Sequence, residues 1–324
     1  MLSIGISYNR PKLCPDAAWS FNGTTILRNA SIGYLPQNVF VDGINTLYVT
    51  SRTRPTVHVW PQSSISITNN ITLNANLSMS LFVHMNGDIF VDNGFLNKRV
   101  DRWNFNTSTI TAVMYVNGSC HGLFISTNDE LYCSMGDFHQ IVKKSLSDIN
   151  NSTIVVAGIG VAGSTSSMLN SPQGIYLDAN INLYVADCGN DRVQLFQSMQ
   201  TTAITVLGNG SSQTIALRCP TSIVLDSDGY LFVVDQMNHR IIGSGPYGFR
   251  CIIGCSGSGS SMSTLLNPQT MAFDSYGNIL VADSSNNRIQ KFTLQTTACG
   301  KPSVTEKSYK CSHYSMVFHF LLSI

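Results

Sequence analysis

An aspartate followed at a fixed short distance by an arginine recurs along the second half of the chain. The pairs are Asp187/Arg192, Asp235/Arg240 and Asp283/Arg288, with a more widely spaced fourth pair at Asp92/Arg99. A carboxylate beside a guanidinium can serve as an acid–base dyad, or it can hold a structure together through charge-assisted hydrogen bonds. A catalytic dyad is needed once, whereas a structural joint is needed in every repeat. The recurrence therefore predicts structural inter-blade pairs and assigns no catalytic residue.

Each Asp and Arg flank a polar turn between two runs typical of strands, such as "NLYVAD" and "RVQLF". At the base of a hairpin, a guanidinium can bridge the carboxylate and the carbonyls of the adjoining unit. A separate aspartate ends the preceding strand-like run, where its carboxylate can accept the amides of a turn. These aspartates are Asp42, Asp178, Asp226 and Asp274.

The pairs belong to a repeat that covers most of the chain. Six units start at Pro36, Ser78, Cys120, Pro172, Pro220 and Pro268, and the last three align without gaps. Each unit holds short apolar runs rich in branched and aromatic residues. A fourth run precedes the next proline at residues 153–158, 203–208 and 249–254. Four strands in a unit of this length predict the blade of a β-propeller.

The repeated pattern P-x-x-[IV]-x-[LVF]-D, then [LI]-[YF]-V-x-D, then N-x-R-[IV], resembles the NHL repeat. The unit from Pro220 contains "NHRI" at residues 238–241. The resemblance covers about residues 18–294 and is strongest in the last three units. It implies an all-β fold, a six-bladed β-propeller of four-stranded antiparallel blades.

The ends of the repeat region suggest how the ring closes. The last unit has no fourth run after Leu294, and "TTILRN" (residues 24–29) precedes the first unit. We therefore expect an N-terminal strand to complete the last blade. The expected organisation is an N-terminal segment (1–17), the NHL-repeat propeller (18–298) and a C-terminal tail (299–324).

The nine cysteines predict a disulfide framework. No CxxC pair and no His pair at zinc-ligand spacing occur, and an odd thiol remains. In a propeller the expected bridges are Cys14–Cys299, Cys188–Cys219, Cys120–Cys133 and Cys251–Cys255, with Cys311 left over. The first would join the two ends of the ring and remove on the order of 5 kcal/mol of unfolded-chain entropy.

Composition excludes a strongly charged partner. Charged residues are 11% of the chain, with 19 Lys plus Arg against 18 Asp plus Glu, so no net field favours nucleic acid or an anionic membrane. Nine N-x-[ST] motifs, which matter only in a secreted chain, are candidate glycosylation sites. They lie at Asn22, Asn29, Asn70, Asn76, Asn106, Asn117, Asn150, Asn151 and Asn209.

Neither end of the chain carries a recognisable targeting segment. Residues 1–7 lack a charged region and a long apolar core, so no signal peptide is visible, and residues 316–324 are too short to span a bilayer. We expect that the true N-terminus is missing or misassigned.

A channel enzyme is the first alternative. The peptide-amidating lyase resembles an NHL propeller with a metal site, but its ligands have no counterparts in this sequence, and paraoxonase-like calcium esterases need converging Asn and Asp. Zinc needs three ligands, and only His121 and His84 are expected on inner strands. The Gly/Ser run at 254–261 has no P-loop lysine, and no G-x-S-x-G motif occurs. No cofactor is assigned; a structural calcium or zinc in the channel is kept as an alternative.

Three classes of function therefore remain. The favoured one is a secreted, glycosylated, monomeric propeller that binds a protein or glycan ligand on one face and performs no catalysis. The second is the metal-dependent lyase or esterase. The third is recognition of RNA or protein as in TRIM-NHL proteins, which requires a strongly basic face and conflicts with the sequons and cysteines.

Overall fold

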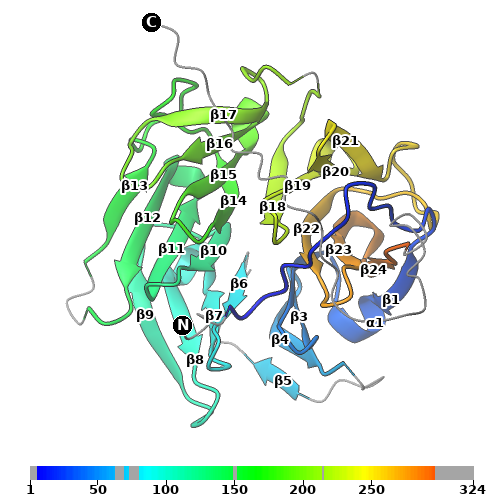
Figure 1. Ribbon diagram of the computed structural model, residues 1–324. Helices are drawn as coiled ribbons and strands as arrows, with labels where there is room; N and C mark the ends of the chain where they lie inside the picture. Colours follow the sequence, from blue (N-terminus) through cyan, green and yellow to red (C-terminus); the bar gives the residue numbers. More distant parts are fainter. Residues whose placement is uncertain (1–5, 63–68, 73–79, 149–151, 214, 296–324) are drawn as a thin grey trace, which may run out of the picture.

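The computed structural model describes residues 6–62, 69–72, 80–148, 152–213 and 215–295. Their strands form six four-stranded antiparallel sheets, as the repeat predicts. Figure 1 shows the sheets arranged around a common centre, so the fold is an all-β propeller with six blades.

In the first five blades the strands follow one another along the chain from the innermost outward. The first blade contains β2 (Pro36–Val41), β3 (Leu47–Ser51), β4 (Arg54–Trp60) and β5 (Asn69–Thr72). The second contains β6 (Leu81–Val83), β7 (Ile89–Asp92), β8 (Arg99–Trp103) and β9 (Ile110–Tyr115). The third contains β10 (Gly122–Ile125), β11 (Glu130–Met135), β12 (Gln140–Ser145) and β13 (Ile154–Ala157).

The fourth to sixth blades correspond to the three most regular repeats. The fourth contains β14 (Pro172–Leu177), β15 (Leu183–Asp187), β16 (Arg192–Phe196) and β17 (Ala203–Gly208). The fifth contains β18 (Pro220–Leu225), β19 (Leu231–Asp235), β20 (Arg240–Gly245) and β21 (Gly248–Ile253). The sixth contains β22 (Pro268–Phe273), β23 (Ile279–Asp283), β24 (Arg288–Phe292) and, outermost, β1 (Thr24–Arg28).

The N-terminal strand closes the ring as predicted. β1 pairs antiparallel with β24, from Thr24 opposite Lys291 to Arg28 opposite Arg288. The last blade is therefore built from both ends of the repeat region, and in Figure 1 the blue β1 lies beside the orange strands.

Burial follows from the place of each strand in its blade. The second strands, such as β19 and β23, are buried along their whole length because neighbouring blades cover both faces. Their sequences are accordingly continuous apolar runs. Outer strands such as β17 and β13 keep exposed positions. The core thus lies between the blades.

Short turns connect the second and third strands. They are the 3-10 turns η1 (Gly136–Phe138), η2 (Cys188–Asn190), η3 (Gln236–Asn238) and η4 (Ser284–Asn286). The second blade has a four-residue helix instead, α2 (Gly94–Asn97), and α1 (Asn29–Ile32) follows β1. Within the described ranges, no helix has the length and apolar character needed to cross a membrane.

Candidate functional site

Arg192 lies at the centre of a dense set of charge-assisted hydrogen bonds. Its Nε donates to Asp187 Oδ2 at 2.7 Å, and its two terminal nitrogens donate to the carbonyls of Ser164, Thr165 and Met168 at 2.7–3.0 Å. Those carbonyls belong to the loop that leads from the third blade into the fourth. The guanidinium therefore fixes this inter-blade loop against the turn after β15.

The same arrangement recurs in the fifth and sixth blades. Arg288 Nε donates to Asp283 Oδ2 at 2.7 Å, and its terminal nitrogens bind carbonyls at Ser260, Ser261 and Thr264. Arg240 makes a smaller set, to Asp235 Oδ2 at 2.8 Å and to the Ala216 carbonyl. The Arg240 side chain is 27% exposed, against 7% for Arg192 and 5% for Arg288. Three of the four predicted pairs are thus brought together.

The second blade departs from the pattern, and the predicted pairing of Asp92 with Arg99 is wrong. Asp92 Oδ1 accepts the Cys120 amide at 3.0 Å, and Arg99 Nε lies 2.8 Å from Asp101 Oδ1. The turn in this blade is the helix α2 rather than a three-residue 3-10 turn. It separates Arg99 from Asp92, so the next aspartate along β8 replaces it as the partner.

A contact that joins consecutive blades was missed at the sequence level. The residue between the Asn and the Arg of the N-x-R pattern has a left-handed backbone, as at Asp191 (φ 54°). Its carboxylate accepts the amide of Cys219, just before β18 of the next blade, at 2.8 Å. We call this contact the inter-blade joint.

The inter-blade joint recurs with different side chains. His139 Nδ1 accepts the Ser171 amide, His239 Nδ1 accepts the Asn267 amide, and Asn287 Oδ1 accepts the Leu35 amide, at 2.9–3.1 Å. The shared signal is an acceptor atom at the same repeat position, carried by Asp, Asn or His. The identity of the residue varies, which hides the pattern from inspection of repeated letters.

A glycine at the end of the outer strand packs closely against the turn that contains the left-handed residue. Gly208 ends β17 with φ +87°, and a Cβ there would lie 2.3 Å from the Asp191 carbonyl oxygen. Only a residue without a side chain fits at that distance. The outer strand therefore packs directly on the backbone that positions the inter-blade joint.

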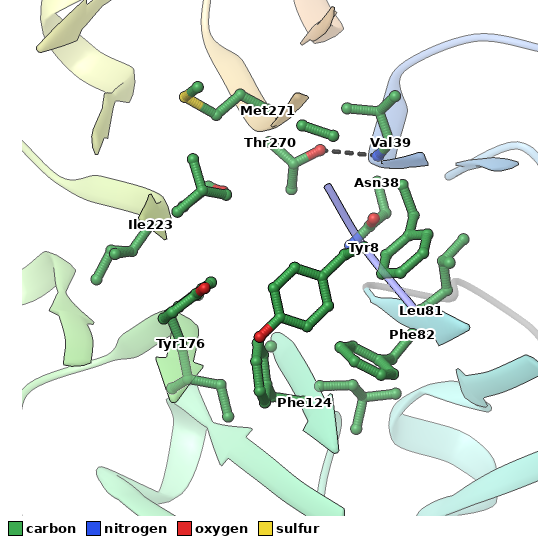
Figure 2. A pocket seen from close by; sticks show the side chains of 18 of the residues that line it. Tyr8, Asn38, Val39, Leu81, Phe82, Phe124, Tyr176, Ile223, Thr270 and Met271 are labelled. Atoms are coloured by element: carbon green, nitrogen blue, oxygen red, sulfur yellow. Dashed lines mark hydrogen bonds between the residues drawn. The ribbon is translucent and has the colours of Figure 1, made fainter. Parts of the chain in front are cut away.

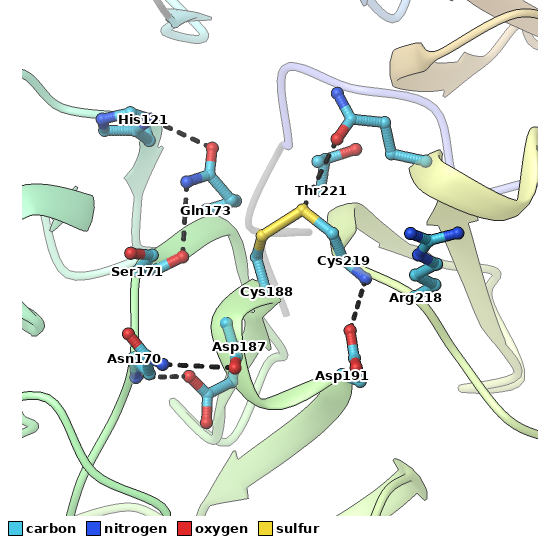
Figure 3. The surroundings of a disulfide bond; sticks show 12 residues. His121, Asn170, Ser171, Gln173, Asp187, Cys188, Asp191, Arg218, Cys219 and Thr221 are labelled. Atoms are coloured by element: carbon cyan, nitrogen blue, oxygen red, sulfur yellow. Dashed lines mark hydrogen bonds between the residues drawn. A yellow bond between two sulfur atoms is a disulfide. The ribbon is translucent and has the colours of Figure 1, made fainter.

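Three predicted disulfides are present. Cys188–Cys219 joins η2 of the fourth blade to the residue before β18 of the fifth, at the inter-blade joint, as Figure 3 shows. Cys120–Cys133 joins the segment just before β10 to β11 within one blade, and Cys251–Cys255 joins β21 to the turn that follows it. Cys299 and Cys311 lie outside the described residues, so the Cys14–Cys299 bridge stays a prediction.

The four aspartates predicted to end inner strands hold the first hairpin turn of their own blades, as predicted. Asp178 Oδ1 accepts the amides of Asn180 and Asn182 at 2.9 Å, and Oδ2 accepts the Asn182 side-chain amide. Asp226 makes the corresponding bonds from Oδ1 to Asp228 and Tyr230. Because Tyr230 replaces the asparagine, the buried Asp226 Oδ2 has no hydrogen-bond partner among the described residues.

Burial raises the pKa of Asp226 to about 6, despite the two backbone amides that favour its charged form. A carboxyl whose pKa is higher in the folded than in the unfolded state binds its proton more tightly when folded. The stability it contributes is complete below the unfolded pKa of about 4 and is lost as pH rises to about 6.

We expect Asp226→Asn to remove part of the pH dependence of stability. The wild-type free energy of unfolding should fall by on the order of 2–3 kcal/mol more than that of the variant between pH 4 and pH 7. Urea denaturation of both proteins across this range measures the difference. Parallel curves would show that Asp226 does not titrate in this window.

An N-terminal strap, residues 7–12, crosses one mouth of the central channel. The Ser7 carbonyl accepts the Gly43 amide, the Pro11 carbonyl accepts the Ser227 amide, and Arg10 donates to the Asp226 carbonyl. The strap therefore binds hairpin turns of the first and fifth blades. Figure 1 shows this dark blue segment passing over the middle of the ring.

The strap inserts Tyr8 into the channel. The Tyr8 ring packs edge-on against Phe82, Phe124 and Tyr176, with ring centroids 5.5–6.1 Å apart (Figure 2). These three rings, with Phe40, occupy the same register position on the inner strands of the first four blades. A cavity of about 100 Å³ remains beside them.

The histidines that the structure describes do not converge on a metal site. His121 borders the channel cavity, with Nδ1 3.0 Å from Gln173 Oε1, and burial lowers its pKa. His84 follows β6, and its Nε2 lies 3.1 Å from Asp129 Oδ1. Within the residues that the structure describes, no three His, Cys, Asp or Glu side chains gather where they could hold a metal.

Several predicted glycosylation sites are accessible. The side chains of Asn22, Asn106, Asn117 and Asn209 are exposed, and that of Asn29 is half-buried. Asn76, Asn150 and Asn151 lie outside the described residues, and the Asn70 side chain is not described. Glycosylation itself stays a prediction.

Comparison with protein families identifies one repeat directly. Residues 265–292, which include β22, β23 and β24, match the NHL repeat. No curated protein matches the sequence.

Solved structures match over most of the chain. A protein of unknown function from Bacteroides thetaiotaomicron is 13% identical, with a TM-score of 0.70 over 86% of this chain and 76% of its own. An auxiliary nutrient binding protein from that organism is 15% identical, with a TM-score of 0.61 over 89% and 76%. Virginiamycin B lyase from Staphylococcus aureus is 12% identical, with a TM-score of 0.60 over 83% and 98%. At these identities the likeness shows a common fold alone.

Proposed function

Because the chain is a six-bladed β-propeller with an NHL repeat, we propose that it is a secreted, glycosylated scaffold that binds a protein or glycan ligand. In this proposal the propeller is a monomer, performs no catalysis of its own, and presents loops on a rigid ring.

The observation that supports this proposal is that the repeated aspartates and arginines are used up in structural hydrogen bonds. Asp187 uses Oδ1 to accept the Asn170 amide and Oδ2 to accept Arg192 and Asn190, so its carboxylate is committed to the turn. The same bonds recur at Asp283. Groups that resemble catalytic dyads are thus occupied in holding loops and turns, which supports a structural role for the pairs.

Oxidised cysteines support an extracellular location. Three disulfides are present in the described chain, and disulfides persist mainly in oxidising compartments. Exposed sequons on both sides of the ring, such as Asn106 after β8 and Asn209 after β17, agree with passage through the secretory pathway.

Neighbouring hairpin tips on the strap side offer a contact surface. Asn45 and Ser275 bind each other through two hydrogen bonds of 2.7 Å, which holds the first and sixth blades' tips together. Beside them Ile44 and Tyr276 are exposed. An aromatic ring next to an aliphatic side chain suits protein contacts and stacking on a sugar ring.

Two measurements test the proposal. Mass spectrometry of protein secreted from eukaryotic cells should find glycans at several of Asn22, Asn106, Asn117 and Asn209. Binding to panels of extracellular proteins and glycans should then weaken at least about tenfold in Ile44→Ala/Tyr276→Ala. The matched control is Ile159→Ala/Val161→Ala, which removes two exposed apolar side chains from the loop after β13.

Other experimental outcomes would overturn the proposed function. Unmodified asparagines at every sequon contradict secretion. Stoichiometric zinc or calcium in purified protein, together with turnover of a lactone or peptide substrate, would favour the channel enzyme. Equal loss of binding in both double variants would contradict the assignment to the strap side.

A further inference from the structure

We propose that the central channel contains a blind pocket for one small uncharged ring molecule, of about the size of phenol. This inference goes beyond the proposed function, because it concerns the channel interior and does not depend on a partner at either face. It rests on the shape of the cavity beside Tyr8, on the residues that line it, and on the strap that closes one mouth.

The shape of the cavity comes from an asymmetry among the inner strands. The first four blades place Phe40, Phe82, Phe124 and Tyr176 at one register position. The fifth and sixth blades place Val224 and Ala272 there, opposite Phe232 and Leu280 of the next strands. Tyr8 packs on the aromatic side, which leaves space against the two small side chains.

The partial exposure of two lining residues is consistent with an open space beside them. Val224 and Ala272 are only half-buried although they lie on innermost strands. Figure 2 shows the Tyr8 ring next to Phe82 and Phe124, with open space between Tyr8 and Ile223. Both small residues line the cavity of about 100 Å³.

The lining determines the charge of the ligand. Among the described residues around the cavity there is no Asp, Glu, Lys or Arg, and His121 has a lowered pKa, so it is neutral at pH 7. A buried ion without a charged partner would pay a large desolvation cost. The ligand is therefore neutral.

The residues that line the cavity also determine the polarity of the ligand. Burial raises the pKa of Tyr8 and of Tyr176, so both phenols keep their protons. Thr270 Oγ1 is already used, donating to the Gln37 carbonyl and accepting the Val39 amide. The Tyr8 phenol, which belongs to the lining, is the group that we assign to a hydroxyl on the ligand.

The volume of the cavity limits the size of the ligand, and the strap determines the mouth by which it enters. An apolar cavity of about 150 Å³ can hold benzene. This cavity is smaller, about 100 Å³, but it is open at one mouth, so a single six-membered ring fits only with its substituent directed toward that opening, and nothing larger fits. The strap blocks the mouth formed by the hairpin turns. Entry is therefore from the opposite mouth, where half-buried Asn38, His121 and Gly174 border the cavity.

The test is titration of the full-length protein with phenol, followed by calorimetry and by NMR of the aromatic side chains. Wild-type protein should bind one phenol. Ala272→Leu, which fills the space, should weaken binding by at least about tenfold, and Ala216→Leu, the same change at an exposed loop position, should leave it unchanged.

Two further variants keep the proposal falsifiable. Val224→Phe places in the fifth blade the ring that four other blades carry, and should block phenol as Ala272→Leu does. Tyr8→Phe should weaken phenol several-fold and leave toluene binding unchanged, because only the hydroxyl is lost. No phenol binding to wild-type protein, or undiminished binding in both filled variants, would overturn the proposal without bearing on glycans or partners.

Discussion

Arg192→Ala is expected to lower the free energy of unfolding by about 3–5 kcal/mol, because the substitution leaves the Asp187 carboxylate buried without its charge partner. Asp187 is fully buried, and the guanidinium also supplies donors to three carbonyls of the loop before β14. Urea denaturation followed by tryptophan fluorescence measures the loss.

Arg240→Ala is the matched control for this change. Arg240 occupies the same repeat position, and its partner Asp235 is as buried as Asp187. The Arg240 side chain, however, is 27% exposed and makes fewer bonds, so water can reach the carboxylate and replace part of what is lost. We expect a cost of about 1–2 kcal/mol. Equal costs for the two arginines, or less than about 1 kcal/mol for Arg192→Ala, would contradict the structural role.

Replacing both Cys188 and Cys219 with serine is expected to cost on the order of 4 kcal/mol. The bridge closes a loop with a sequence separation of 31, and the loop-closure model relates this length to the entropy that the unfolded chain regains. The variant should keep the hydrogen bond from the backbone amide of residue 219 to the Asp191 carboxylate at the same inter-blade joint, so it should fold with a lower urea midpoint.

The control for the bridge is Cys251→Ser/Cys255→Ser. This pair has a sequence separation of 4, so the same model gives about 2 kcal/mol. Both variants are compared by urea denaturation under non-reducing conditions. A larger loss in the short-loop variant would mean that local packing, not loop closure, determines the contribution of these bridges.

The features that the sequence predicts correctly are those tied to repetition. Pro172, Pro220 and Pro268 mark inner strands because equal spacing leaves one alignment, and the same alignment places Asp187 beside Arg192 and Cys188 beside Cys219. The pairing of β1 with β24 follows from counting strands in the last unit. Each of these conclusions needs only the repeat and the geometry of a closed ring.

The features that sequence inspection missed depend on three-dimensional contacts that do not recur as the same residue in every repeat. Tyr8 precedes all six units, and its place in the channel depends on rings contributed by three different blades. Asp101 becomes the partner of Arg99 only because the turn in the second blade is longer. His139 and Asp191 perform one task with unlike side chains, since what the inter-blade joint requires is an acceptor atom on a left-handed residue.

The closure of the ring by β1 affects the order in which the protein can be made. β1 is synthesised before the first blade, yet its partner β24 is synthesised only after the first five blades. Until then, the outer strand and the unfinished sheet both present unpaired backbone edges. The ring can close only after β24 has been made, so nascent chains that stall before β24 should be prone to aggregation and to exchange of β1 between molecules.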